Sequence, residues 1–372
     1  MKIVAEGILN AAEPRGHRAV SIYPTITALE NGGLVATYMV GPSKDSDCNT
    51  IELRWSLDNG VSWGGPTAPF STTLDGRRGS LLAAYLTPIS NEHLIVVAAW
   101  VDRQAHPGRP LFNPDTEGTL PMEIVLADSH DSGQTWSSWR VLSVPKTLGP
   151  PAVTALLRLL EGGLVLSFET GKHYNDASKW YQKVWWCHSR DQGRTWTIPV
   201  PKFQDPNGRI FHWDQKAGVS PDGQLVTFAW TYDHETRRYL NIHRRTSSDE
   251  GKSWTDPEDL GISDQPSHPA ILPDGRVVLA WVDRFNTGTI RARLSKSIHA
   301  PFLAETEITI YEHPEIRETR RTYKDTGELL SDLHLWTFGH PHAEALPSGE
   351  VMVVFYAGTN GSLSTRWVRV SL

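Results

Sequence analysis

The sequence predicts an all-β protein, a six-bladed β-propeller that occupies residues 1–372 as a single domain. A short motif occurs four times in the chain, and a longer strand–turn–strand pattern occurs six times. The composition includes 30 Gly and 25 Pro, as a chain of many short strands and turns requires. Units that recur along the whole chain indicate a repeat architecture rather than two unrelated domains.

The short motif reads Ser-x-Asp-x-Gly-x-(Ser/Thr)-Trp. Its copies are Ser56–Trp63, Ser129–Trp136, Ser189–Trp196 and Ser247–Trp254. An Asp side chain can accept backbone N–H groups and close a tight turn, and Gly suits a positive φ. The Trp supplies a large apolar surface between neighbouring sheets. We therefore expect one hairpin turn per copy, with a structural role.

The longer pattern is an apolar strand, a Gly-containing turn and a second apolar strand. Its copies begin at Tyr23, Gly79, Pro151, Lys216, His268 and His340. The first strand of each copy is rich in small residues and suits a crowded axis, whereas the second is rich in Val, Leu and Phe and suits burial on both faces. Six copies predict six blades of four strands.

The two ends of the chain both have strand character, in KIVAEGIL and STRWVRVSL. We expect one end to complete a blade that begins at the other, since this closes the ring without free edges. The charged segment 305–332 interrupts the repeat, and it is interpreted as an insertion between blades five and six.

Composition limits the partners. The formal net charge of −6 argues against nucleic acid and anionic membranes, which favour basic surfaces. Two cysteines exclude a disulfide framework. No 18-residue apolar run predicts a membrane span, and the N-terminus lacks the apolar core of a signal peptide, which favours a cytoplasmic location. We expect no cofactor.

Candidate site residues follow from the expected geometry. If the short motifs lie at one end of the propeller, the starts of the inner strands and the ends of the second strands meet at the other. The predicted catalytic residues there are Asp45, Asp47, Asp214 and His340. The predicted substrate-binding residues are Arg18, Arg78, Arg103, His173, His212, Trp213, Lys216, His268, Arg284 and His342.

These residue types suit acidic sugars. Arginine pairs with carboxylates through two parallel hydrogen bonds, and imidazole titrates near neutral pH. No tight ligand spacing such as HExxH is present, so no catalytic metal is predicted, although it stays open whether a metal binds the histidines.

The short motif resembles the Asp-box (BNR repeat) of the sialidase, or neuraminidase, superfamily. The resemblance implies a sialidase-like propeller with the motifs on the face away from the active site. It also implies an acid/base Asp at Asp45 or Asp47. The sequence departs from the family elsewhere: Ile22 stands where the first Arg of the arginine clamp is expected, His340 where the nucleophilic Tyr is expected, and Val219 near the activating Glu.

The first functional hypothesis is therefore a sialidase-like glycoside hydrolase that acts on a terminal, acidic sugar without the usual Tyr/Glu/Arg set. Asp47 or Asp45 would be the acid, and His340 or Asp214 the opposing group. A polysaccharide lyase that uses a His base on uronate-containing glycans is one alternative. A non-catalytic glycan-binding propeller is the other.

Overall fold

The computed structural model describes residues 1–314 and 326–372, and within these ranges the strands fall into six antiparallel units. Units one and six belong to one seven-stranded sheet, because the parallel bridge Val20↔Leu363 joins them. Unit one is β2 (Val20–Ala28), β3 (Leu34–Gly41) and β4 (Thr50–Ser56). Unit two is β6 (Arg77–Pro88), β7 (Leu94–Asp102), β9 (Met122–Ser129) and β10 (Arg140–Val141), with β5 (Thr73–Leu74) beside β6. Unit three is β11 (Pro151–Arg158), β12 (Leu164–Thr170), β14 (Lys183–Ser189) and β15 (Val200–Gln204).

Unit four is β16 (Ile210–Val219), β17 (Leu225–Asp233), β19 (His243–Ser247) and β20 (Glu258–Asp259), with β18 (Arg238–Tyr239) beside β17. Unit five is β23 (Val277–Asp283), β24 (Thr289–Ser295) and β25 (Ile308–Glu312), and its inner strand is broken into β21 (Gln265–Pro266) and β22 (Ala270–Ile271). Unit six is β26 (Phe338–Ala345), β27 (Val351–Thr359), β28 (Ser362–Ser371) and β1 (Lys2–Asn10).

The remaining elements are short. They are the parallel pair β8 (Gly118–Thr119) and β13 (Lys172–His173), the helix α1 (Thr326–Asp332), and the 3₁₀ turns η1 (Lys146–Leu148), η2 (Ala304–Thr306) and η3 (Leu333–Leu335). In the described ranges no helix is long and apolar enough to cross a bilayer.

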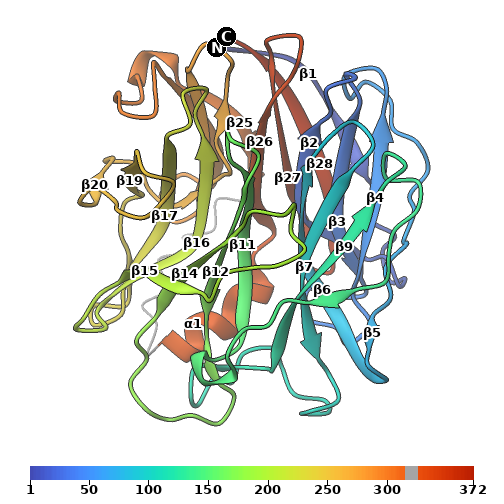
Figure 1. Cartoon of the computed structure of the whole chain (residues 1–372), viewed down its shortest axis with the longest axis vertical. Coiled ribbons are helices and arrows are strands. Elements are labelled where there is room, and N and C mark those ends of the chain that lie inside the picture. The colour runs from blue at the N-terminus through green and yellow to red at the C-terminus, as the bar shows by residue number, and fades with distance from the viewer. Residues whose placement is uncertain (315–325) are drawn as a thin grey trace.

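The six predicted hairpins are confirmed as antiparallel strand pairs: β2–β3, β6–β7, β11–β12, β16–β17, β22–β23 and β26–β27. The expected meeting of the chain ends is confirmed too, because β1 pairs with β28 from Lys2↔Ser371 to Asn10↔Thr365. Figure 1 shows the two termini side by side. The first strand of the chain thus completes the last unit.

Neighbouring units are held together by buried apolar clusters. Each unit shares a cluster with the next, and unit six shares one with unit one, as shown by the pairs Met39/Val96, Leu126/Phe168, Trp186/Ala217, Phe228/Leu279, Ala292/Phe355 and Tyr38/Val354. Burying one such side chain stabilises the fold by about 1.5–3 kcal/mol. The packing therefore returns to its starting point, as in a closed ring of sheets.

The four repeated turns have one hydrogen-bond pattern. In the second copy, Ser129 Oγ accepts the Gly133 N–H at 2.8 Å, and Asp131 Oδ1 accepts the Thr135 N–H at 2.9 Å. Gly133 has φ +86°, and a Cβ there would lie 3.1 Å from the Trp55 ring of unit one. The structural role predicted for these turns is thus confirmed: their side chains close the turn by hydrogen bonds, and the turn packs against the preceding unit.

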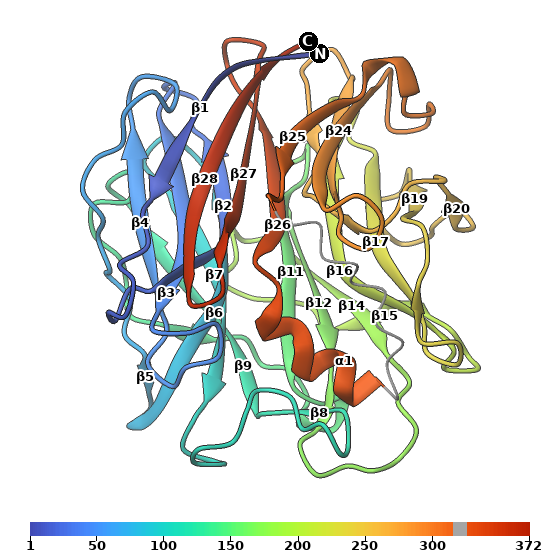
Figure 2. The ribbon, with the colours of Figure 1, turned by 180° about the vertical axis from the view of Figure 1, so that it is seen from behind.

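Part of segment 305–332 lies outside the described residues, and its insertion character stays a prediction. Ile308–Glu312 within it is β25, which pairs with β24 as the outer strand of unit five. Figure 2 shows α1, the other described part, next to β26 and at the end of the molecule opposite the termini. The helix contributes Leu330 to the wall of a cavity at that end.

Candidate functional site

A cavity of about 190 Å³ lies where the inner strands begin. Its walls include Tyr23 of β2, Ala152 of β11, Asp214 of β16 and His340 of β26. Aromatic side chains form much of the remaining surface, namely Tyr85, Phe112, Trp180, Trp213, Trp230 and Tyr239. An apolar pocket with a few convergent polar groups is typical of a small-molecule site.

Three of the lining residues have an unusual backbone. Tyr23, Asp214 and His340 have φ values of +52°, +44° and +49°. Each lies at a break in strand register, between Ile22 and Thr25, Trp213 and Lys216, and Gly339 and His342. Bulges re-aim side chains and are common beside active sites. Here the bulges turn a phenol, a carboxylate and an imidazole into one cavity.

Asp214 is the centre of a polar network. Its Oδ1 accepts the Lys216 ammonium at 2.5 Å, and its Oδ2 accepts the Gln265 side-chain amide at 2.9 Å. The Nε2 of His340 is 3.7 Å from the same Oδ2. Burial opposes ionisation of Asp214, but the charge of Lys216 and the hydrogen bonds from Lys216 and Gln265 outweigh it, and the pKa of Asp214 lies below its usual range. Asp214 is therefore a carboxylate at neutral pH.

Glu169, at the end of β12, is the second carboxyl group of the cavity. Its Oε2 accepts the Asp214 N–H and the Gln182 side-chain amide, each at 3.2 Å. Burial, together with the charge of Asp214, raises the pKa of Glu169 to about 8. The site thus holds one protonated and one ionised carboxyl group at neutral pH.

The other polar groups extend this network. The Tyr23 ring meets the His340 ring edge to face, with centroids 4.5 Å apart, and burial raises the pKa of the phenol. Burial also lowers the pKa of His340 to about 3, so the imidazole is neutral. Lys216 donates a second hydrogen bond to the Tyr85 hydroxyl at 3.0 Å. A phenol, a neutral imidazole and an ammonium therefore face the carboxyl pair.

Of the predicted residues, the structure brings Asp214, His340, Trp213 and Lys216 together. The first three line the cavity, and Lys216 is bonded to Asp214. Arg284 lies nearby, with its guanidinium 3.2 Å from Asp264 and 3.9 Å from the centre of the Trp336 ring.

Asp45 and Arg103 form an ion pair of 2.7 Å just outside the lining residues. Asp45 Oδ2 also accepts the N–H of Leu111, which does line the cavity. Asp47 and Arg78 are exposed and are not among the lining residues. Arg18 pairs with Glu13 and Glu52 and bonds Asn10 of β1. These placements favour structural contacts for Arg18 and Arg103.

The predicted histidines do not gather in this cavity. His173 is exposed on β13 and lines a separate cavity, and His212 is buried with its ring 6.3 Å from that of Phe203. His268 and His342 stack at 4.5 Å, and they line another cavity, formed by the later parts of the inner strands. Only His340, at a bulge, faces the cavity of Asp214 and Glu169.

Sequence reasoning left out Glu169, Tyr23 and Tyr85 as site residues. One signal for Tyr23 was available, because Pro24 follows it inside an apolar strand pattern, and Pro in a strand marks an edge or a bulge. Pro341 marks His340 in the same way. Glu169 is the next-to-last residue of its strand, close to the position of Asp102, Asp233 and Asp283, which end theirs. The carboxylates of these three residues instead accept N–H groups of the following loop. No sequence signal separates the two roles.

The comparisons with solved structures identify the fold. A protein of unknown function from Dyadobacter fermentans is 18% identical, with a TM-score of 0.73 over 99% of each chain. An α-L-arabinanase from Penicillium chrysogenum, complexed with arabinobiose, is 17% identical, with a TM-score of 0.65 over 99% of this chain and 98% of that one. An intramolecular trans-sialidase from Ruminococcus gnavus is 12% identical, with a TM-score of 0.65 over 99% and 97%.

No protein-family model matches the sequence, and no match was found among curated protein sequences. At these identities the structural likeness defines the fold and not the activity. The likeness covers nearly the whole of each of the three chains. The chain therefore shares its fold with these three proteins, an arabinanase and a trans-sialidase among them.

Proposed function

We propose that the six antiparallel units are the blades of a six-bladed propeller and that the cavity of Glu169 and Asp214 is its active site. The closed sequence of apolar clusters supports the ring. The inner strands of five units line the cavity, and this supports the proposal that the cavity lies on the axis of that ring.

We infer that the protein is a glycoside hydrolase. The observation that carries this proposal is the pair of carboxyl groups whose pKa values are pushed apart in one cavity. Glycosidases use one protonated carboxyl group to donate to the leaving oxygen and one carboxylate as base or nucleophile. Glu169 would be the acid and Asp214 the second group, with Lys216 holding Asp214 in its ionised form.

The size of the cavity favours a terminal sugar. Its volume of about 190 Å³ is below the ~300–1,000 Å³ of pockets for drug-sized ligands. The aromatic walls suit the apolar face of a sugar ring. Lys216 and Arg284 add positive potential at His340, and this favours an acidic substituent on the sugar.

The lyase alternative rests on His340 and Tyr23. In a lyase, the His340 imidazole, in ring contact with the Tyr23 phenol, would abstract the proton next to a uronate carboxyl group. The burial that lowers the pKa of His340 to about 3 makes it a weak base, so the lyase ranks second. Asp45 stays in the hydrolase proposal as a positioning residue, since it accepts an N–H of the cavity wall. A binding function without catalysis would give no role to the separated pKa values of Glu169 and Asp214.

The test is a product screen with two matched variants. The protein is assayed on aryl glycosides and on uronate-containing oligosaccharides, and released aryl groups, new reducing ends and ultraviolet absorbance of unsaturated products are measured. Hydrolysis predicts reducing ends without ultraviolet absorbance. We expect Glu169→Gln to lower kcat by about 10²–10⁴-fold, because a positioned acid contributes that much. Glu161→Gln, on the exposed turn of the same hairpin, is the control.

Ultraviolet-absorbing products lost in His340→Asn would replace the hydrolase proposal with the lyase. Saturable binding of the oligosaccharides without any product would support the binding module instead. Equal rates for Glu169→Gln and Glu161→Gln would remove Glu169 from the mechanism.

A further inference from the structure

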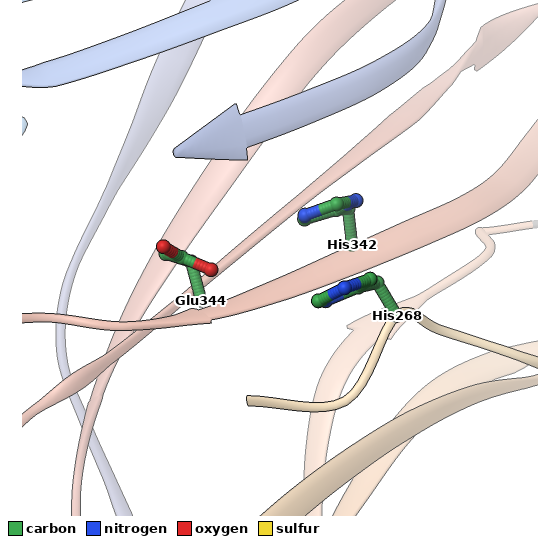
Figure 3. A group of neighbouring side chains, drawn as sticks. All are labelled: His268, His342 and Glu344. Carbon is green, nitrogen blue, oxygen red and sulfur yellow. The ribbon is translucent and has the colours of Figure 1, made fainter. Parts of the chain in front are cut away.

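A second set of side chains lies apart from the cavity of Glu169 and Asp214, farther along the inner strands. His342 and Glu344 come from β26, and His268 comes from the break between β21 and β22. One ligand atom from each of the three residues lies within 4.8 Å of the other two. Figure 3 shows the two imidazole rings one above the other, with the Glu344 carboxyl group beside them. Among the described residues this is the one group of three or more such side chains that could hold an ion.

We propose that His268, His342 and Glu344 bind a divalent transition-metal ion of the zinc type. Two imidazoles and a carboxylate are a donor set that zinc accepts, with bonds of about 2.0–2.2 Å. The inference does not depend on the glycosidase proposal, because the two sites share none of these residues.

The outer contacts of the histidines match those of metal ligands. His268 Nδ1 is 3.4 Å from the carbonyl oxygen of Ala343, and His342 has a hydrogen bond to the backbone of Ile26. A ring N–H that donates to a carbonyl leaves the lone pair of the other ring nitrogen for an ion.

Glu344 completes the set with one oxygen. Its Oε1 accepts the Ala28 N–H at 2.9 Å, so this oxygen is held by β2. The second oxygen is left for an ion. Ligand atoms that share one tetrahedral zinc ion lie closer together than 4.8 Å. The three side chains would therefore have to rotate so that their ligand atoms move by about 1 Å toward the ion.

The surroundings have room for the ion and for water. His268, His342 and Glu344 line a cavity of about 150 Å³, together with Thr25, Tyr85 and Leu156 of three other units. A fourth ligand of the ion would be a water molecule in this cavity. The ion would join two inner strands that already form a β-bridge, His268↔His342, at the place where the strand of unit five is broken. The ion would thus tie the inner strands of units five and six together.

The experiment measures Zn²⁺ binding to the full-length protein after chelation and dialysis. Calorimetric titration with Zn²⁺ should give one site per chain with a Kd of about 1 µM or tighter. Saturating Zn²⁺ should raise the melting temperature by a few degrees, because an ion that binds only the folded state stabilises it. Co²⁺ at the same site should give visible absorption bands of low-symmetry coordination.

Variants locate the site. We expect His342→Gln to abolish stoichiometric binding and Glu344→Gln to weaken it by about 10–100-fold. His212→Gln removes a buried histidine outside the cluster and should leave binding unchanged. Absence of a stoichiometric Zn²⁺ site in the wild-type protein would overturn the proposal. This result does not depend on whether the variants fold. Unchanged affinity in Glu344→Gln and His342→Gln would do the same.

Discussion

At the scale of single residues, the cavity depends on three side chains that the backbone presents in an uncommon conformation. Tyr23, Asp214 and His340 all have positive φ, although none is glycine. Such a backbone costs about 1–3 kcal/mol at each position and persists where the surroundings impose it. Here the inner strands β2, β16 and β26 impose it by their bulges. One of the three, Asp214, is the carboxylate of the proposed hydrolase, and the other two are the pair on which the lyase alternative rests.

The pKa of Glu169 gives a pH dependence. If Glu169 donates a proton, kcat/KM depends on its protonated form, so the rate should fall as pH rises through about 8. The measurement is the pH profile of kcat/KM on the best substrate of the screen. The fall should keep its position in Glu161→Gln and disappear from the residual rate of Glu169→Gln. A wild-type rate that stays constant through pH 8 would exclude Glu169 as the acid.

Sequence alone could predict some of these residues and not others. Asp214, Trp213, Lys216 and His340 were found because they lie at the starts of inner strands, a position that follows from the repeat. Asp47 lies in the loop between β3 and β4, and Arg78 lies at the start of β6, but both side chains remain exposed. The role of Glu169 depends on its burial beside Asp214. The sequence around Glu169 does not predict that this side chain is buried.

At the scale of elements, the repeated turn is the most regular part of the molecule. Its Ser hydroxyl accepts the Gly N–H at 2.8–2.9 Å in all four copies. The sequence predicted these turns fully, because the contacts are local and depend on residues at most four positions apart. The break in the inner strand of unit five was not predicted, although Pro269, which has no N–H to donate, lies within it.

The turn makes a testable contribution to stability. In Ser129→Ala the buried Gly133 N–H loses its acceptor, which should lower the free energy of unfolding by about 1–3 kcal/mol. Chemical denaturation of the variant and the wild type measures the difference. Ser138→Ala changes an exposed serine beyond the same turn and should have little effect. Equal unfolding midpoints for the two variants would show that the hydrogen bond does not stabilise the turn.

At the scale of the whole molecule, the order of the units brings distant parts of the chain together. Tyr23 and His340 are in ring contact although they lie near opposite ends of the sequence. The pairing of β1 with β28 and the cluster of Tyr38 with Val354 join the same two ends. The sequence repeat predicted that such residues would meet, because similar units arranged in a ring place their equivalent positions at the same end of the molecule. It could not predict that the histidines would line different cavities.

The central claim is that the cavity of Tyr23, Asp214 and Glu169 binds and cleaves a terminal sugar. Its most direct test is a crystal structure of Glu169→Gln soaked with the oligosaccharide that the wild type cleaves. We predict density for one sugar ring between Trp213 and His340, with its glycosidic oxygen within hydrogen-bond distance of residue 169. A sugar bound at the His268 end of the inner strands or on the outer surface would contradict the account.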